Sequence, residues 1–295
     1  MTLNTSGAFN LASFSDSVAS LAGDSTGTVR NSVTSTTSTL TVNPTTGVST
    51  AFAGVIAGTS GGTQGNLALL KTGVGTLTLS GANTYSGSTT VNAGALFVNG
   101  STASGSAVAV NNSETTLGGS GTINGTVNVA SAGANLSPGA SGSGSTAILN
   151  TGALTLIANS NLNVDINGTT AGSSYDQLII TGTVNLGGAL ASNLVVSAGA
   201  GLAVNQKFFI LLNDSTDAIS GTFAQGTTVT ASNGDVFLIN YADNGDGGVL
   251  GNDISLTATS VVPEPGTYAA GILTLAALFC QQRRRLSGLL RKVRS

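Results

Sequence analysis

One stretch in the first third of the chain decides the predicted fold: LLKTGVGTLTLSGANTYSGSTTVNAGAL, residues 69–96. Apolar and polar residues alternate here in three runs, Gly75–Gly81, Thr89–Gly94 and Ala95–Gly100, the last of which continues beyond the stretch. Alternation with a period of two is typical of strands that bury one face, and Gly or Asn between runs is typical of tight turns. The stretch therefore predicts short strands joined by turns.

The same alternation recurs further along the chain, which predicts a body made almost entirely of strands. No segment between the runs has the helical length that connects parallel strands in α/β folds. A β-solenoid avoids such crossovers, because each coil stacks on the next with Val, Leu and Ile inside and Gly or Asn at the corners. We therefore expect an all-β fold, a β-solenoid over residues 1–258, with a β-sandwich array as the alternative. The further runs are Gly121–Val129, Gly152–Ile157 and Asn161–Ile166.

The composition indicates an ordered body that does not bind nucleic acid. Only 7% of residues are charged, 40% are hydrophobic and the formal net charge is -3, which is unlike a disordered chain. Six of the nine Lys and Arg residues fall within residues 283–295, so the body lacks a basic stripe that could neutralise phosphates.

Residues 69–96 closely resemble the autotransporter-associated β-strand repeat, and weaker similarity to the same passenger regions covers most of residues 8–258. The resemblance implies an exported, passenger-like region that winds as a right-handed parallel β-helix. The segments of weaker similarity are Gly118–Gly125, Leu136–Gly139, Tyr175–Gly182, Ile219–Phe223 and Asn252–Leu256.

The last part of the chain, residues 259–295, has a different character. Pro263, Glu264 and Pro265 favour an extended backbone, because Pro lacks an N–H and disfavours helix at the residue before it. An apolar run at about residues 266–282 follows, slightly shorter than the roughly 20 residues that span a bilayer comfortably. Arg283, Arg284 and Arg285 begin a basic tail over residues 283–295, which the positive-inside rule places in the cytoplasm. We expect a short C-terminal transmembrane helix with the body outside.

This arrangement resembles the PEP-CTERM sorting signal, with Pro263, Glu264 and Pro265 matching its motif position by position. The resemblance implies processing by an exosortase in a Gram-negative bacterium that makes exopolysaccharide. It also implies a transient anchor in the inner membrane, cleavage near the motif and delivery to the cell surface or the biofilm matrix. The start, Met1 to Gly7, lacks the basic and apolar parts of an export signal, so we expect the natural chain to begin upstream.

The sequence predicts no catalytic residue and no cofactor. There is no histidine, which excludes a Ser-His-Asp triad, a Cys-His pair and a His-ligated zinc site. Paired carboxylates could still cleave a glycosidic bond, although solvated turn aspartates are the simpler interpretation. We expect a non-catalytic structural or adhesion protein with extracellular polysaccharide or cell-surface components as partners. The alternative is a polysaccharide lyase or glycosidase on a β-helix, with candidate acids Asp165, Asp176, Asp214, Asp217 and Asp235.

A single segment, from Asp243 to Asp253, weakly resembles a calcium-binding turn, since it combines carboxylates, amides and Gly corners. Calcium-binding nonapeptides occur as tandem units, whereas this segment is one imperfect copy. We therefore expect a strand-connecting turn and no metal site.

Overall fold

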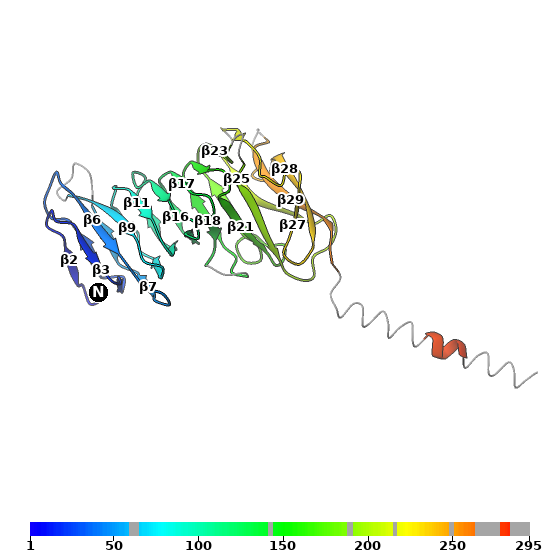
Figure 1. The fold of residues 1–295 in the computed structure, drawn as a ribbon, viewed down its shortest axis with the longest axis horizontal. Coiled ribbons are helices and arrows are strands. Elements are labelled where there is room, and N and C mark those ends of the chain that lie inside the picture. The colour runs from blue at the N-terminus through cyan, green and yellow to red at the C-terminus, as the bar shows by residue number, and fades with distance from the viewer. Residues whose placement is uncertain are drawn as a thin grey trace, which may run out of the picture.

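The computed structural model describes residues 1–58, 65–140, 144–187, 191–214, 217–247, 251–262 and 278–283. Within these residues the chain forms 29 strands, which wind as stacked coils along the long axis of the body (Figure 1). Each coil runs through three sides in the same order, and we number the sides in that order. The all-β prediction is confirmed.

The first side is a nine-stranded sheet in which every neighbouring pair is parallel. Its strands come from successive coils, so residues distant in sequence become direct neighbours; Thr76, for example, pairs with Ala95. The strands are β1 (Thr2–Leu3), β4 (Ala22–Gly23), β7 (Ser49–Phe52), β10 (Thr76–Leu79), β12 (Ala95–Val98), β15 (Thr116–Gly119), β18 (Asn135–Pro138), β21 (Asn161–Ile166) and β24 (Asn193–Ala198).

The second side begins as a three-stranded sheet and continues as an eight-stranded one. An isolated parallel bridge between Ala82 and Ser101 lies where the fourth coil crosses this side. The small sheet holds β2 (Ala8–Asn10), β5 (Thr28–Arg30) and β8 (Val55–Ala57). The larger holds β13 (Ser101–Thr102), β16 (Thr122–Ile123), β19 (Ile148–Thr151), β22 (Gln177–Ile180) and β25 (Lys207–Asn213), followed by β29 (Asp253–Ser260), β28 (Val236–Asp243) and β27 (Thr228–Thr230).

The third side is again a nine-stranded parallel sheet. This repeated parallel pairing agrees with the predicted β-solenoid and differs from a sandwich, whose sheets are antiparallel. The right-handed sense of winding stays a prediction from the resemblance. The strands are β3 (Asp16–Val18), β6 (Thr37–Val42), β9 (Asn66–Lys71), β11 (Thr89–Val91), β14 (Val108–Val110), β17 (Val127–Val129), β20 (Leu154–Leu156), β23 (Val184–Asn185) and β26 (Ile219–Ser220).

The core is a set of apolar columns that run along the solenoid. Successive side chains of a strand point to opposite faces, so every second residue enters the interior. Because the coils stack in register, like residues meet: one column on the first side consists of leucines that are all buried. Its members are Leu77, Leu96, Leu117, Leu136, Leu162 and Leu194.

The corners are tight enough that one of them requires glycine. Gly94 has a positive φ of 65°. A Cβ atom there would lie 2.4 Å from the carbonyl oxygen of Gly75 in the preceding coil. Only a residue without a side chain allows this approach.

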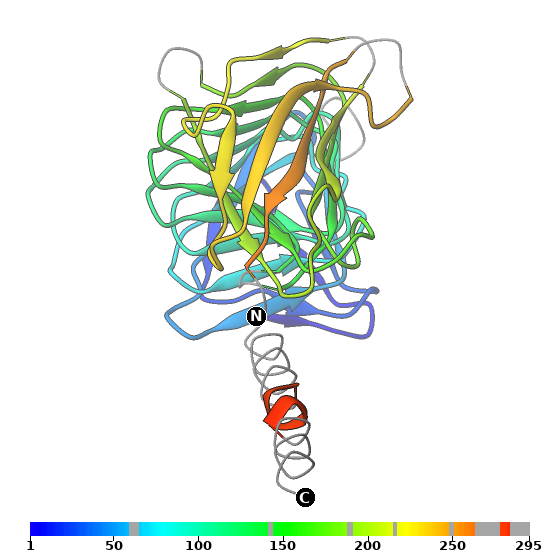
Figure 2. The same cartoon turned by 90° about the vertical axis from the view of Figure 1, so that its right-hand side faces the viewer.

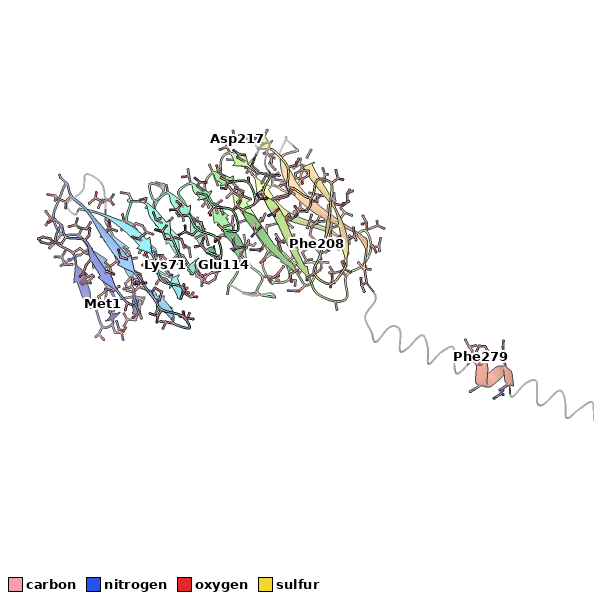
Figure 3. The ribbon with its side chains drawn as sticks, in the orientation of Figure 1. Met1, Lys71, Glu114, Phe208, Asp217 and Phe279 are labelled. Atoms are coloured by element: carbon pink, nitrogen blue, oxygen red, sulfur yellow. The ribbon has the colours of Figure 1, made fainter. Side chains whose placement is uncertain are left out.

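The solenoid ends in an antiparallel cap, which the sequence did not predict. Strand β29 pairs antiparallel with both β25 and β28, and β27 pairs antiparallel with β28. These strands cross the last coils in Figure 2. Phe208, labelled in Figure 3, is fully buried here and meets Phe237 edge to face at 6.1 Å. Strand β29 pairs with the remaining edge of β25, so the parallel stacking of the second side ends there.

Residues 278–283 are helical, and Leu278 and Phe279 in this stretch are exposed. Within the described ranges, none of the helices combines the length and apolar character needed to cross a membrane.

Candidate functional site

The residues of the predicted sorting motif, Pro263, Glu264 and Pro265, lie outside the described residues. The same holds for Arg284 and Arg285, and for the predicted apolar helix at 266–282 before residue 278. Arg283 is described and is exposed at the end of the 278–283 helix. The sorting segment therefore stays a prediction.

The body of the protein extends slightly further than the predicted boundary at residue 258. Ala258 is fully buried within β29. Beyond the strand, the Val262 N–H donates to Oδ1 of Asp235 at 2.6 Å. Asp235 is itself 2% exposed and accepts a second bond at Oδ2 from Asn233 Nδ2. The folded body thus holds the chain up to the residue before Pro263.

Lys71 is the most unusual residue of the repeat, because it occupies a core position. Its neighbours in the same inward column are Val42 and Val91, and its own side chain is fully buried. The ammonium Nζ donates to the carbonyl oxygens of Gly73 at 2.6 Å, Ala93 at 2.9 Å and Thr72 at 3.4 Å. It thereby joins the corner of its own coil to the corner of the next.

Burial lowers the pKa of Lys71 to about 8, because the charged form loses its hydration. The three acceptors around the ammonium are backbone carbonyls, whose dipoles compensate part of this loss. Sequence reasoning did not assign this residue a role. A signal was present, since Leu67, Leu69 and Lys71 share one phase of the strand's alternation.

Asn83 and Tyr85, two further polar residues of the repeat, are also buried. Asn83 is 3% exposed; its Oδ1 accepts from the Ile56 N–H at 3.0 Å and its Nδ2 donates to Ser101 O at 3.1 Å. The Tyr85 hydroxyl lies 2.7 Å from Thr89 Oγ1, inside the core. These contacts connect three successive coils. The repeat is therefore a stacking element.

Residues 69–97 match the passenger-associated-transport-repeat. This is the autotransporter-associated β-strand repeat, so that part of the predicted resemblance is confirmed, over residues 69–97 of the chain. No curated protein matches the chain.

The structure brings two of the candidate acids together, Asp165 and Asp176, but in structural roles. Asp176 is 1% exposed and accepts the N–H groups of Ala147 at 2.8 Å and Asp165 at 2.9 Å. Burial raises the pKa of Asp176 to about 7. The two hydrogen bonds act to lower this pKa, whereas the charge of the nearby Asp165 raises it further. Asp165 Oδ2 accepts the Gly144 N–H at 2.7 Å. Both carboxylates hold the loop that precedes β19.

The remaining candidate acids are spread over the last coil and the cap. Asp214 Oδ2 accepts the Gly182 N–H at 3.1 Å, and Asp235 anchors the chain at Val262. Asp217 contributes its backbone carbonyl to Asn213 Nδ2 at 2.7 Å. Asp214 and Asp217 also share a donor, because Asn252 Nδ2 donates to the backbone carbonyl of each. These contacts hold neighbouring segments of the chain in place.

The segment between Asp243 and Asp253 connects β28 to β29, as predicted for a strand-connecting turn. The fully buried Asp253 carboxylate accepts the N–H groups of Asn213, Gly245 and Asp246. Asp243 Oδ2 accepts from Lys207 Nζ at 2.8 Å and from Ser255 Oγ at 2.6 Å. Partial burial acts to raise the pKa of Asp243, but these donors lower it to about 2. Within the described ranges, no cluster of three or more His, Cys, Asp or Glu residues could hold a metal ion.

Proposed function

We propose that the chain is a non-catalytic exported protein of the bacterial cell surface or extracellular matrix, with a structural or adhesive role. One observation carries this proposal: in the segment that matches a passenger repeat, the buried polar side chains form hydrogen bonds within the protein's own stacked coils. Lys71 and Asn83 each donate to a backbone carbonyl of the following coil, and the Tyr85 hydroxyl bonds Thr89 inside the core. A rigid shaft whose sides carry few charges is suited to presenting surface and to lateral contacts.

The proposal includes a sorting step at the end of the chain. Pro263, Glu264 and Pro265 would be recognised by an exosortase-like enzyme, while Arg283, Arg284 and Arg285 hold the segment at the cytoplasmic face of the inner membrane. The Val262 anchor supports this division, because the folded body holds the chain at the residue directly before the motif. After cleavage the body would join extracellular polysaccharide or other surface components.

Cell fractionation and intact-mass measurement in the producing bacterium test this proposal. We expect the body in the surface or extracellular fraction, with a mass that lacks Arg283 to Ser295. A variant with Ala at positions 263–265 should accumulate uncleaved in the inner membrane. If the main extracellular form of the native chain still carries Arg283 to Ser295, the sorting step is refuted. A cytoplasmic native chain would refute export altogether.

The competing function is a carbohydrate-active enzyme on the same scaffold. The purified protein, incubated with acidic and neutral polysaccharides, should release neither reducing ends nor unsaturated products. Sustained product release, abolished by Asp165→Asn, would replace the structural proposal with an enzymatic one.

A further inference from the structure

A hollow of about 350 Å³ lies at the corner between the second and third sides. It spans the coils that contain β13, β16, β19 and β22, and so extends along the solenoid axis. We call it the corner groove. Its lining residues are Ser104, Thr122, Ile123, Asn124, Asn150, Thr151, Gly152 and Thr181.

The groove exists because successive corners differ in length. Five residues, 103–107, connect β13 to β14, whereas three connect β16 to β17 and two connect β19 to β20. The surface is therefore set back at the two middle coils, and the longer corner at Ser104 forms a wall. This shape depends on the paired, rigid coils, so it is present before any ligand binds.

The exposed lining consists of hydroxyls and amides. Thr122 and Asn150 are register partners on β16 and β19, so their side chains repeat along the axis at the spacing of neighbouring strands, about 4.8 Å. Both are half-buried, while Ser104, Asn124 and Thr181 are exposed. A row of neutral donors and acceptors in a shallow groove suits a polyhydroxylated chain lying lengthwise.

The groove is unsuited to a peptide. Strands β16 and β19 are already hydrogen-bonded on both sides, so no free edge is available for strand addition. An amphipathic helix would need an apolar groove, and Ile123 is buried beneath the polar lining.

The net negative charge of the body disfavours binding of an acidic polymer. Its basic residues before residue 263 are Arg30, Lys71 and Lys207. Lys71 is buried, and Lys207 forms an ion pair with Asp243 at 2.8 Å. Eleven of the twelve acidic residues also lie in this body, so its field repels polyanions.

We propose that the corner groove binds a neutral, linear polysaccharide that runs parallel to the solenoid axis. This inference rests on the proposed function, which places the body among extracellular polysaccharides. It deepens that function by naming the site and the uncharged class of the polymer.

Affinity electrophoresis of the purified full chain tests the groove. Gels would contain hydroxyethyl cellulose, galactomannan or dextran as neutral probes, and polygalacturonate as the acidic one. At least one neutral polymer should retard the native protein, and polygalacturonate should not. Thr122→Glu should weaken the retardation about tenfold or more, because it places a charge in the groove that must be desolvated against the polymer.

The matched control is Thr155→Glu, a half-buried strand threonine on the third side, which should bind like the native chain. Thr181→Glu, at an exposed groove position, gives a second groove variant in case Thr122→Glu unfolds the protein; circular dichroism monitors this. The inference would be overturned if only polygalacturonate, or no polymer at all, retarded the native protein. It would also be overturned if both groove variants and the control variant were retarded equally. Surface localisation in the producing cells would still stand in each of these cases, so failure of the groove is distinguishable from failure of the proposed function.

Discussion

The Lys71 ammonium lies 2.9 Å from the carbonyl oxygen of Ala93, which belongs to the following coil. The contact places a positive charge in an apolar column, with Val42 on one side and Val91 on the other. Its other strong acceptor is Gly73, at the corner of its own coil. A single side chain thus connects the corners of two coils inside the residues that match the passenger repeat.

Replacing Lys71 with Met should destabilise the body by about 1–3 kcal/mol, because the corner carbonyls lose their buried donor. The measurement is urea unfolding monitored by far-ultraviolet circular dichroism. Lys207→Met is the matched control, since it removes a lysine from a half-exposed ion pair and should cost less than about 1 kcal/mol. Equal losses for the two variants would contradict the stacking role of Lys71.

Gly94→Ala should destabilise the solenoid by more than Gly47→Ala. Both glycines have positive φ values, 65° and 76°, so each substitution carries a left-handed backbone cost of about 1–2 kcal/mol. Only at Gly94 would the new Cβ meet backbone, 2.4 Å from Gly75 O; at Gly47 it meets nothing within 4 Å. Thermal unfolding midpoints of the two variants are compared. The fall in midpoint for Gly47→Ala gives the conformational cost, and the additional fall for Gly94→Ala gives the cost of the clash. Similar midpoints would show that the coils can move apart at this corner.

Asparagines at neighbouring positions of the first side form a ladder of hydrogen bonds. Removing its middle member should lower the free energy of unfolding more than removing an end member. Asn161 Nδ2 donates to Asn135 Oδ1, and Asn161 Oδ1 accepts from Asn193 Nδ2, each at 3.1 Å. Asn161→Ala removes both bonds and Asn193→Ala one, at about 0.5–1.5 kcal/mol per bond. Denaturant unfolding of the two variants should show this order, and a reversed order would mean that the ladder is not a stabilising unit.

Stability should fall as the pH rises from about 4 to about 7, and Asp176 should cause much of that fall. Its pKa is raised to about 7 in the folded protein, so within this window the native state keeps a proton that the unfolded state has released. The slope for one such group is at most about 1.4 kcal/mol per pH unit. The negative charge of Asp165 adds to the rise in the pKa of Asp176. Chemical unfolding at several pH values measures the slope.

Asp176→Asn supplies the control for this pH dependence. The variant should be less stable at pH 4, since an amide cannot reproduce both contacts with Ala147 and Asp165, and its stability should change little between pH 4 and 7. An unchanged slope in the variant would assign the pH dependence to other groups.

The alternation of apolar and polar residues was sufficient to predict where strands form, but it did not predict which strands pair with one another. The runs at Gly75–Gly81 and Asn161–Ile166 contain β10 and β21. The alternation of β9 also carries the information that Lys71 points inward, although its carbonyl partners lie on corners that only stacking brings together. The antiparallel cap was missed because alternation along a strand, as in β29, does not indicate whether its partner runs parallel or antiparallel.

The sequence by itself determined the all-β character, the short strands, the corners and the distinct composition of residues 259–295, because alternation, turn residues and charge are read from neighbours along the chain. Only the tertiary structure decided which strands pair, where the parallel winding ends, that Asp176 is buried and that a groove forms between Ser104 and Thr181. These features depend on contacts between residues many positions apart, such as Asn161 with Asn193, and on small differences in corner length. Their free energies arise from stacking and burial, which no local pattern contains.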